Sequence, residues 1–446
     1  MMRYPRVLIV ALGRINASDS ANDGLLVRNL FGSWPRENLA QIFSSGDNGD
    51  DGFFGHYYQL RSCDRVFGSL FYKLKGSATA EVPTITSIDK NFVIPTGLIP
   101  QLKGFARRMF IDTGIYELLF RPRLSAEMER CVKEFQPDII FAQGYNLTFT
   151  WLPLLLKKAT GAKLAFLCSD DWPTYLYSGQ LGESTLFRWF VRPVVKTATH
   201  RLLSEVDVPF AFGQPMADEY ASRYGKFFFT LNHADNSRRF DSATPHRIHP
   251  PDVKTIIAIG NYNRFRWPLL LDANDACQEL HAQGIKMRLV VLSSAIDAEG
   301  VNALSTAPFI DVLPDPGNDL LPAYLKGADI LLLAEGFEEG FVSAIKLSVS
   351  SKAHLFMFSH RPIIVYAHPD TGIARYAQTS GWGSLVKHRN KRELVEAIRG
   401  LIENQKQTDS LIARADEVAE KFHSHQANRE ILLRGLASSS LEWGEK

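Results

Sequence analysis

The 446-residue chain is predicted to have an α/β fold made of two doubly wound domains with parallel sheets. Short apolar runs alternate with longer stretches of helical periodicity along most of the sequence, which is the pattern of β–α–β units. A polar stretch rich in proline, residues 235–254, interrupts this alternation once. Because 446 residues exceed what one ordinary hydrophobic core holds, two domains joined by that stretch are the simplest arrangement.

The first domain, residues 1–234, begins with the apolar run Val7–Leu12, which predicts a strand. Segment 46–104 does not follow the alternation, and it either shapes a pocket or covers an edge of the sheet. Its turn-rich part around Asp47 is interpreted as a loop, because the twelfth position, where a calcium loop needs glutamate, is Tyr58. The remaining elements expected here are the strands 39–43, 139–142, 164–168, 201–204 and 227–231, and the helices 24–31, 147–158, 183–199 and 216–224.

After the predicted linker, residues 235–254, a second domain is expected over residues 255–420. The tail, residues 421–446, is expected to be helical, because the helical pattern that starts near Arg392 has polar breaks only near Gln405 and His423. The elements expected in the second domain are the strands 255–259, 287–293, 330–333 and 363–366, and the helices 269–283, 320–326, 353–358 and 372–377.

Composition and charge exclude several classes of protein. The chain has 50 basic and 48 acidic residues, which argues against a nucleic-acid binder. Its four cysteines form no C-x-x-C pair and its histidines lack ligand spacing, so we expect no metal site and reduced thiols. The first strand begins at about Arg6, and no apolar run approaches the ~18 residues of a membrane span, so we expect a cytoplasmic protein without a signal peptide.

Cationic residues gather where two predicted strands end in the second domain. Arg264 and Arg266 follow the strand 255–259, and Ser351-Lys352 opens a helix after the strand 330–333. The carboxyl ends of parallel strands and the N-termini of the following helices meet at one edge of a sheet, where phosphorylated ligands bind. Arginine and lysine side chains supply the charge that such ligands need. The alternative is that these residues are solvated in loops.

Four stretches together resemble the GT-B glycosyltransferases of the family 4 type. They are GNYNRFR at 260–266, LPAYLKGAD at 321–329, SVSSK at 348–352 with RPII at 361–364, and NHAD at 232–235. The resemblance implies two Rossmann-like domains that face each other across a cleft. It also implies transfer of a sugar from a nucleotide-sugar donor to a saccharide or lipid-linked acceptor, with retention and without a metal or cofactor. The residues implied to bind the donor are Gly260, Arg264, Arg266, Glu335, Glu339, Ser351 and Lys352.

The sequence departs from this family at two glutamates that lie eight positions apart. Counting back from Pro362 places them at Leu355 and Leu347, so both carboxylates are absent. In the family one of them holds the ribose hydroxyls of the donor. Glu335 and its neighbours Glu338 and Glu339 could replace it, or they could form a solvated acidic loop.

The first domain should hold the acceptor. Asp170 and Asp171 follow a predicted strand and could orient an acceptor hydroxyl, or they could cap the turn before Pro173. The segment 141–146 lacks the histidine that the family often has just after the fourth strand, and Tyr145 or Asn146 could contact an acceptor hydroxyl instead. Gly24 lets the backbone approach a phosphate, or it is an ordinary turn glycine before a helix.

Two other functions share this fold, namely a catalytically degenerate protein that binds a nucleotide-sugar or a partner transferase, and a nucleotide-sugar epimerase. The missing glutamates favour the first of these, and the lack of a histidine–carboxylate cluster argues against the second. Separately, residues 102–123 mix arginines with aromatic residues. This pattern fits peripheral contact with an anionic membrane, although a core-facing helix with a basic outer face has the same pattern.

Overall fold

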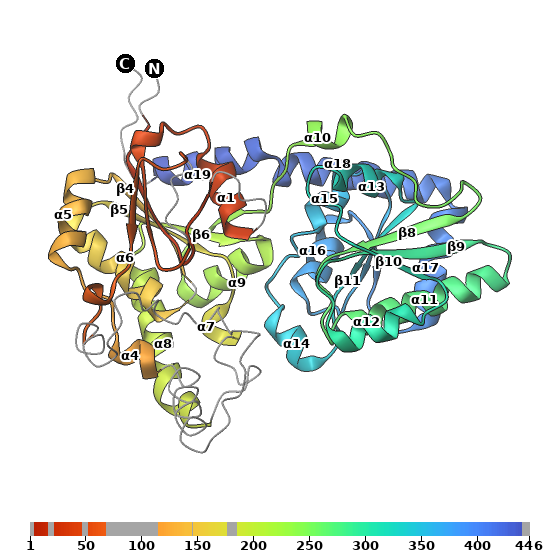
Figure 1. Ribbon diagram of the computed structural model, residues 1–446, viewed down its shortest axis with the longest axis horizontal. Helices are drawn as coiled ribbons and strands as arrows, with labels where there is room; N and C mark the ends of the chain where they lie inside the picture. The colour runs from red at the N-terminus through yellow and green to blue at the C-terminus, as the bar shows by residue number, and fades with distance from the viewer. Residues whose placement is uncertain are drawn as a thin grey trace. The chain divides into compact units, whose positions relative to one another are not determined.

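The protein is described by a computed structural model that covers residues 4–16, 22–46, 52–67, 115–144, 146–175 and 185–438. The chain divides into two compact units (Figure 1). Unit 1 comprises Met1–Phe212, Ala217–Thr230 and Ile431–Lys446, and unit 2 comprises Gly213–Met216 and Leu231–Glu430. The C-terminal tail therefore returns to the first unit.

Unit 1 contains a seven-stranded sheet in the order β3-β2-β1-β4-β5-β6-β7. The interior strand β1 pairs in parallel on both sides, so that Val7 lies opposite Leu39 of β2 and Ile139 of β4. The strand order therefore reverses between β1 and β4, as in doubly wound folds. The strands are β1 (Val7–Val10), β2 (Leu39–Phe43), β3 (His56–Gln59), β4 (Ile139–Gln143), β5 (Lys163–Cys168), β6 (Val208–Phe212) and β7 (Phe229–Leu231).

Helices enclose the unit 1 sheet, and β1, β2, β4 and β6 are buried along their whole length. The last helix, α19, needs Gly435, because a Cβ atom there would lie 2.6 Å from the ring of Phe210 in β6. The helices are α1 (Asn22–Phe31), α4 (Ile115–Leu119), α5 (Ala126–Phe135), α6 (Leu147–Thr160), α7 (Trp172–Tyr175), α8 (Thr185–Glu205), α9 (Gln214–Tyr224) and α19 (His425–Ser438), with short 3₁₀ turns at Arg36–Asn38 and Ser62–Asp64.

Unit 2 contains a six-stranded sheet in the order β10-β9-β8-β11-β12-β13, with every pair parallel. The order reverses between β8 and β11, which makes this the switch point of the unit. The two predicted parallel sheets are thus confirmed. The strands are β8 (Lys254–Ile259), β9 (Met287–Leu292), β10 (Ile310–Leu313), β11 (Ile330–Ala334), β12 (Ile363–Tyr366) and β13 (Ser384–Val386).

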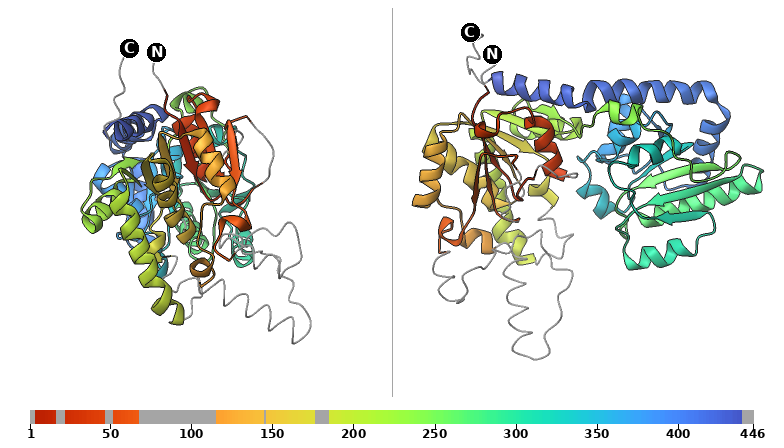
Figure 2. Two further views of the ribbon diagram at one scale, coloured as in Figure 1. Left: turned by 90° about the vertical axis from the view of Figure 1, so that its left-hand side faces the viewer. Right: turned by 45° about the horizontal axis from the view of Figure 1, so that its top comes forward.

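Alternate residues of the unit 2 strands pack into two separate cores. Ile257 and Leu331 pack against α13, α15, α16 and α18, whereas Ile256 and Leu332 pack against α11, α12 and α17 (Figures 1 and 2). The helices are α10 (Ser237–Asp241), α11 (Trp267–Ala282), α12 (Ala298–Ser305), α13 (Leu321–Gly327), α14 (Glu339–Ala344), α15 (Ala353–Met357), α16 (Gly372–Ser380), α17 (Lys391–Glu403) and α18 (Gln405–His423). The polar breaks predicted near Gln405 and His423 coincide with the boundaries of α18.

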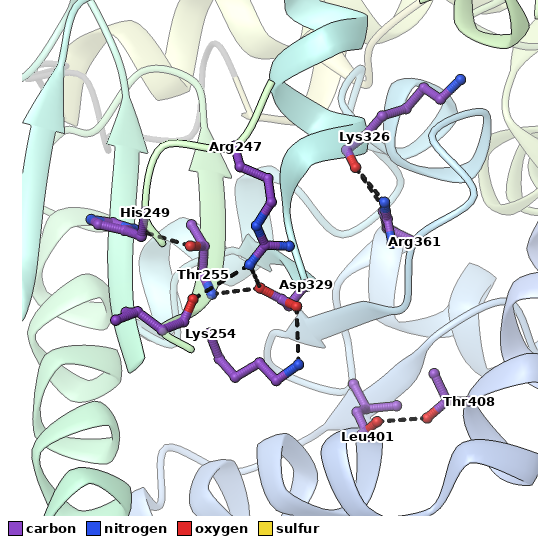
Figure 3. A network of polar contacts seen from close by, with 10 residues as sticks. Arg247, His249, Lys254, Thr255, Lys326, Asp329, Arg361, Leu401 and Thr408 are labelled. Atoms are coloured by element: carbon purple, nitrogen blue, oxygen red, sulfur yellow. Dashed lines mark hydrogen bonds and ion pairs between the residues drawn. The ribbon is translucent and has the colours of Figure 1, made fainter. Parts of the chain in front are cut away.

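The segment 235–254, interpreted from the sequence as a linker, packs onto unit 2. Phe240 of α10 is fully buried in its core. Asp329, just before β11, accepts hydrogen bonds from Arg247 (3.1 Å) and from the backbone N–H of Thr255 (2.9 Å), as Figure 3 shows. Pro245, Pro250 and Pro251 prevent a long helix in this stretch, but the stretch still packs against unit 2.

The predicted strand 201–204 is wrong, because these residues continue α8 to Glu205. Val191, Val195, Ala198 and Leu202 are buried at spacings of four, three and four residues, which is one face of a helix. The next strand is instead β6. In the segment expected to be irregular, β3 adds an edge strand beside β2, whereas Asp47 lies outside the described residues.

Candidate functional site

A pocket lies at the switch point of unit 2, where β8 and β11 end side by side. Ile259 is the last residue of β8, and Ala334 is the last residue of β11. The residues that line the pocket are Ile259, Gly260, Asn261, Tyr262, Arg266, Leu333, Ala334, Glu335, Ser350, Lys352 and Phe356. This is the edge of a doubly wound sheet at which ligands bind.

Gly260 lets the chain turn closely past a lysine directly after β8. Its φ of +131° is a conformation that residues with a Cβ rarely adopt. A Cβ atom there would also lie 2.9 Å from Cε and 3.4 Å from Nζ of Lys352. The backbone therefore favours glycine here, and any side chain at this position would displace the end of Lys352.

Arg266 and Glu335 form an ion pair in the pocket. Glu335 follows β11 and is 5% exposed, and its Oε2 accepts from Nη2 (2.7 Å) and Nε (2.8 Å) of Arg266. The Arg266 guanidinium also lies 5.3 Å from the ring centre of Phe341, which stacks on Phe265 at 4.9 Å. These contacts hold the guanidinium in one place, so little entropy is lost when it binds an anion.

Lys352 is the second cation of the pocket and directly precedes α15. Burial lowers the pKa of its ammonium group, Arg266 lowers it further, and Glu335 opposes both. Among the described residues, none forms a side-chain hydrogen bond or ion pair with this ammonium. The described lining of the pocket thus holds two cations, Arg266 and Lys352, and one carboxylate, Glu335, which leaves an excess positive charge for an anion.

The pocket brings together four of the seven residues predicted to bind the donor, namely Gly260, Arg266, Glu335 and Lys352. The other three do not line it. Arg264 is exposed and lies 4.7 Å from the ring centre of Phe265, Glu339 is exposed at the start of α14, and Ser351 is replaced in the lining by Ser350. The roles of all seven residues stay predictions.

The two positions where the family has glutamates belong to the packing of unit 2. Leu347 is 2% exposed, and Leu355 packs against the core that contains Phe356. Apolar packing occupies both places, so a carboxylate for this site has to come from elsewhere. Glu335 is the carboxylate that lines the pocket.

In unit 1, Asp171 is committed to a local network. Its Oδ1 accepts from Tyr220 Oη and Arg223 Nη1, both at 2.9 Å, and from Thr174 Oγ1 at 3.1 Å. These contacts support the alternative in which Asp171 stabilises the turn before Pro173. Gly24 is buried in the first turn of α1, Asp170 is partly exposed beside Asp171, and Tyr145 lies outside the described residues. Acceptor roles for these residues stay predictions.

The proposed membrane-contact segment, residues 102–123, is described only from Ile115 onward. Leu119 is 46% exposed. Arg121 lies over the ring of Trp151, and Arg123 Nε donates to the carbonyl oxygen of Cys63 at 2.8 Å. No helix in the described part is both long and apolar enough to cross a bilayer. Membrane contact stays a prediction.

Three histidine rings stack beside the pocket, which the sequence did not indicate. His354, in the first turn of α15, lies between His233 (5.8 Å between ring centres) and His423 (6.2 Å) in nearly parallel planes. His423 Nδ1 donates to the carbonyl oxygen of His233 (2.7 Å), and Tyr376 Oη donates to His423 Nε2 (2.9 Å). The three histidines come from distant segments, so no local spacing could reveal them. Within the described ranges, no cluster of potential ligands could hold a metal ion.

The free energy of unfolding should decrease at acidic pH because of these stacked histidines. Burial lowers the pKa of His233 to about 3 and of His423 to about 4. Below the usual pKa of about 6.5 the unfolded chain takes up protons that the folded protein excludes. Stability should therefore be complete above pH 6.5 and fall between pH 6.5 and 4, by about 1.4 kcal/mol per pH unit for each histidine that the folded protein keeps neutral.

Urea unfolding at pH 7.5 and at pH 5 measures this loss. His423→Phe removes one titrating ring, so its stability should depend less on pH than that of the wild type, even though it loses two hydrogen bonds. An equal dependence in both proteins would contradict the assignment.

The comparisons with known proteins identify the fold. No protein-family model matches the chain, and a search of curated proteins finds no match. Among solved structures, it matches sucrose-phosphate synthase from Thermosynechococcus elongatus with 12% identity and a TM-score of 0.56, covering 97% of this chain and 99% of that one. It matches HepE from Anabaena in complex with UDP and glucose with 10% identity and a TM-score of 0.57, covering 98% and 100%.

A third match is a structure titled trehalose-6-phosphate from E. coli bound with UDP-2-fluoro glucose, with 13% identity, a TM-score of 0.58, and 98% and 99% coverage. The chain therefore has the fold of the GT-B glycosyltransferases, over almost its full length. The fold implied by the sequence resemblance is confirmed.

Proposed function

We propose that this protein is a glycosyltransferase that moves a sugar from a nucleotide-sugar to a saccharide or lipid-linked acceptor, with retention and without a metal. The observation that carries the proposal is the convergence of Gly260, Arg266 and Lys352 in one pocket at the β8/β11 switch point. Similar structures hold UDP with glucose, or UDP-2-fluoro glucose.

Glycosyl transfer from a nucleotide-sugar requires the pocket to stabilise the nucleoside diphosphate as it leaves. The bond between the anomeric carbon and the phosphate oxygen breaks, a bond to the acceptor oxygen forms, and the leaving phosphate takes the acceptor proton. Lys352 and Arg266 offset the negative charge that develops on the diphosphate. Because both are largely shielded from water, their attraction for that charge exceeds that of exposed cations. Glu335 keeps Arg266 oriented through the ion pair.

Incubation with UDP-, GDP- and ADP-sugars, with and without saccharide acceptors, tests the proposal. Acceptor-dependent release of a nucleoside diphosphate supports transfer, and its persistence in EDTA supports a reaction without a metal. Formation of an epimer would instead support the epimerase alternative. Tight binding of a nucleotide-sugar without turnover would support the degenerate one.

The Glu335→Gln variant separates two roles of this side chain. If Glu335 replaces the missing family glutamates, it accepts hydrogen bonds from ribose hydroxyls, and a neutral amide should do so more weakly. We expect the variant to bind inorganic pyrophosphate at least as tightly as the wild type, because a competing negative charge is gone, but to bind nucleoside diphosphates about tenfold more weakly. Calorimetry with both ligands measures this, and equal changes for both would exclude ribose recognition by Glu335.

A further inference from the structure

We infer that the stacked rings of His233, His354 and His423 position Lys352 for the diphosphate, although none of the three is among the residues that line the pocket. The inference rests on the proposed function of this pocket. It makes the three histidines positioning residues rather than catalytic ones.

The middle ring of the stack is two residues away from the lysine along the chain. His354 is the second residue of α15, and Lys352 directly precedes that helix. A helix of five residues has little stability of its own, so its place depends on what its side chains contact. The ring of His354 is 5% exposed and is held between two other imidazoles. Movement of this ring would therefore carry Lys352 with it.

The outer rings are fixed by segments on both sides of the stack. His423 ends α18, and its two ring nitrogens bind the backbone of His233 and the hydroxyl of Tyr376 on α16. The backbone N–H of Asp235 donates to the carbonyl oxygen of His423 at 3.0 Å, which ties the same two segments together again. The stack is thus clamped where the chain enters unit 2, near residue 231, and where it leaves, near residue 430.

Electrostatics favours neutral rings in this place. Burial lowers the pKa of both His233 and His354; His423 and Lys352 lower that of His233 further, and His233, His423, Arg239 and His425 lower that of His354 further. Nδ1 of His354 has no hydrogen-bond partner among the residues that the structure describes. An uncharged, flat side chain satisfies the packing without adding repulsion against Lys352. The ring, rather than its proton chemistry, is therefore the feature that matters at position 354.

Two substitutions of His354 test whether a flat ring at this position, rather than an imidazole, is needed to position Lys352. His354→Phe keeps a flat ring, and His354→Leu removes it at similar volume. With inorganic pyrophosphate as the probe, measured by calorimetry at pH 7.5, we expect about tenfold weaker binding for His354→Leu and a change within about twofold for His354→Phe. Rescue by the phenyl ring distinguishes positioning from a need for imidazole.

A matched control removes packing elsewhere in unit 2. Leu280 of α11 is fully buried in the other core of the sheet, so Leu280→Ala should lower the melting temperature without changing the affinity for pyrophosphate by more than about twofold. If His354→Leu binds like the wild type, or if His354→Phe is weakened as much as His354→Leu, the inference is wrong while the proposed function stands. If Lys352→Met binds pyrophosphate as the wild type does, or if the wild type does not bind it, both the inference about the histidines and the proposed function are wrong.

Discussion

Replacing Lys352 by methionine should weaken donor binding about 100-fold while leaving the protein folded and more stable to heat. The ammonium lies in the pocket without a side-chain hydrogen bond or ion pair among the described residues, and burial lowers its pKa. A charge in such a place destabilises the free protein and is useful only when an anion arrives. Methionine has similar length and no charge, so it removes the interaction with the diphosphate and also the desolvation penalty.

The expected loss is about 100-fold in affinity for a nucleoside diphosphate, because hydrogen bonds between charged groups contribute about 1.5–3 kcal/mol each. Calorimetric titration measures the affinity, and thermal unfolding measures the stability. In the wild type, affinity should also fall on the alkaline side at a pH lower than an ordinary lysine would give, because the pKa is lowered.

Arg264→Ala is the matched comparison, because Arg264 is a cation in the loop that also contributes Gly260 and Arg266 to the pocket, but it is not itself among the lining residues. Its guanidinium is exposed and stacks on Phe265, so we expect a loss of less than about fivefold. Equal losses in the two variants would mean that general positive charge, rather than the placement of Lys352, attracts the ligand.

The contrast between Arg264 and Arg266 shows how far sequence reasoning reaches. Both arginines follow a predicted strand, and their spacing alone makes them equally good candidates for binding the donor. The structure separates them, because Arg266 turns toward Glu335 and Phe341, whereas Arg264 stacks outward on Phe265. Alternation of apolar runs was enough to predict two parallel sheets, since burial on both faces leaves a strong pattern.

Long-range contacts explain what could not be predicted. The histidine stack joins residues 233, 354 and 423, and the ion pair of the pocket joins Arg266 to Glu335 across 69 positions. Neither has a local spacing that a single sequence can reveal. The predicted strand 201–204 failed for a different, local reason, because a pair of apolar residues such as Leu202-Leu203 fits the end of a helix as well as a short strand.

Gly260→Ala should also remove donor binding, and a double-mutant cycle with Lys352 can show why. The new methyl group would lie 2.9 Å from Cε of Lys352, so the lysine must move away from its position in the pocket. The φ of +131° adds a backbone penalty, and together we expect about 1–3 kcal/mol of lost stability. Gly225→Ala is the matched control, because Gly225 also has a positive φ, of +64°, but a methyl group there meets nothing within 4 Å.

In the Lys352→Met background the side chain that the methyl group displaces no longer carries the charge that binds the ligand. Gly260→Ala should therefore weaken pyrophosphate binding strongly in the wild type and hardly at all in the Lys352→Met protein, so that the two effects are far from additive. Gly225→Ala should lower the stability of both the wild type and the Lys352→Met protein without changing their affinity for pyrophosphate. Additive losses at positions 260 and 352 would mean that Gly260 contributes through its own backbone N–H, independently of the lysine packed against it.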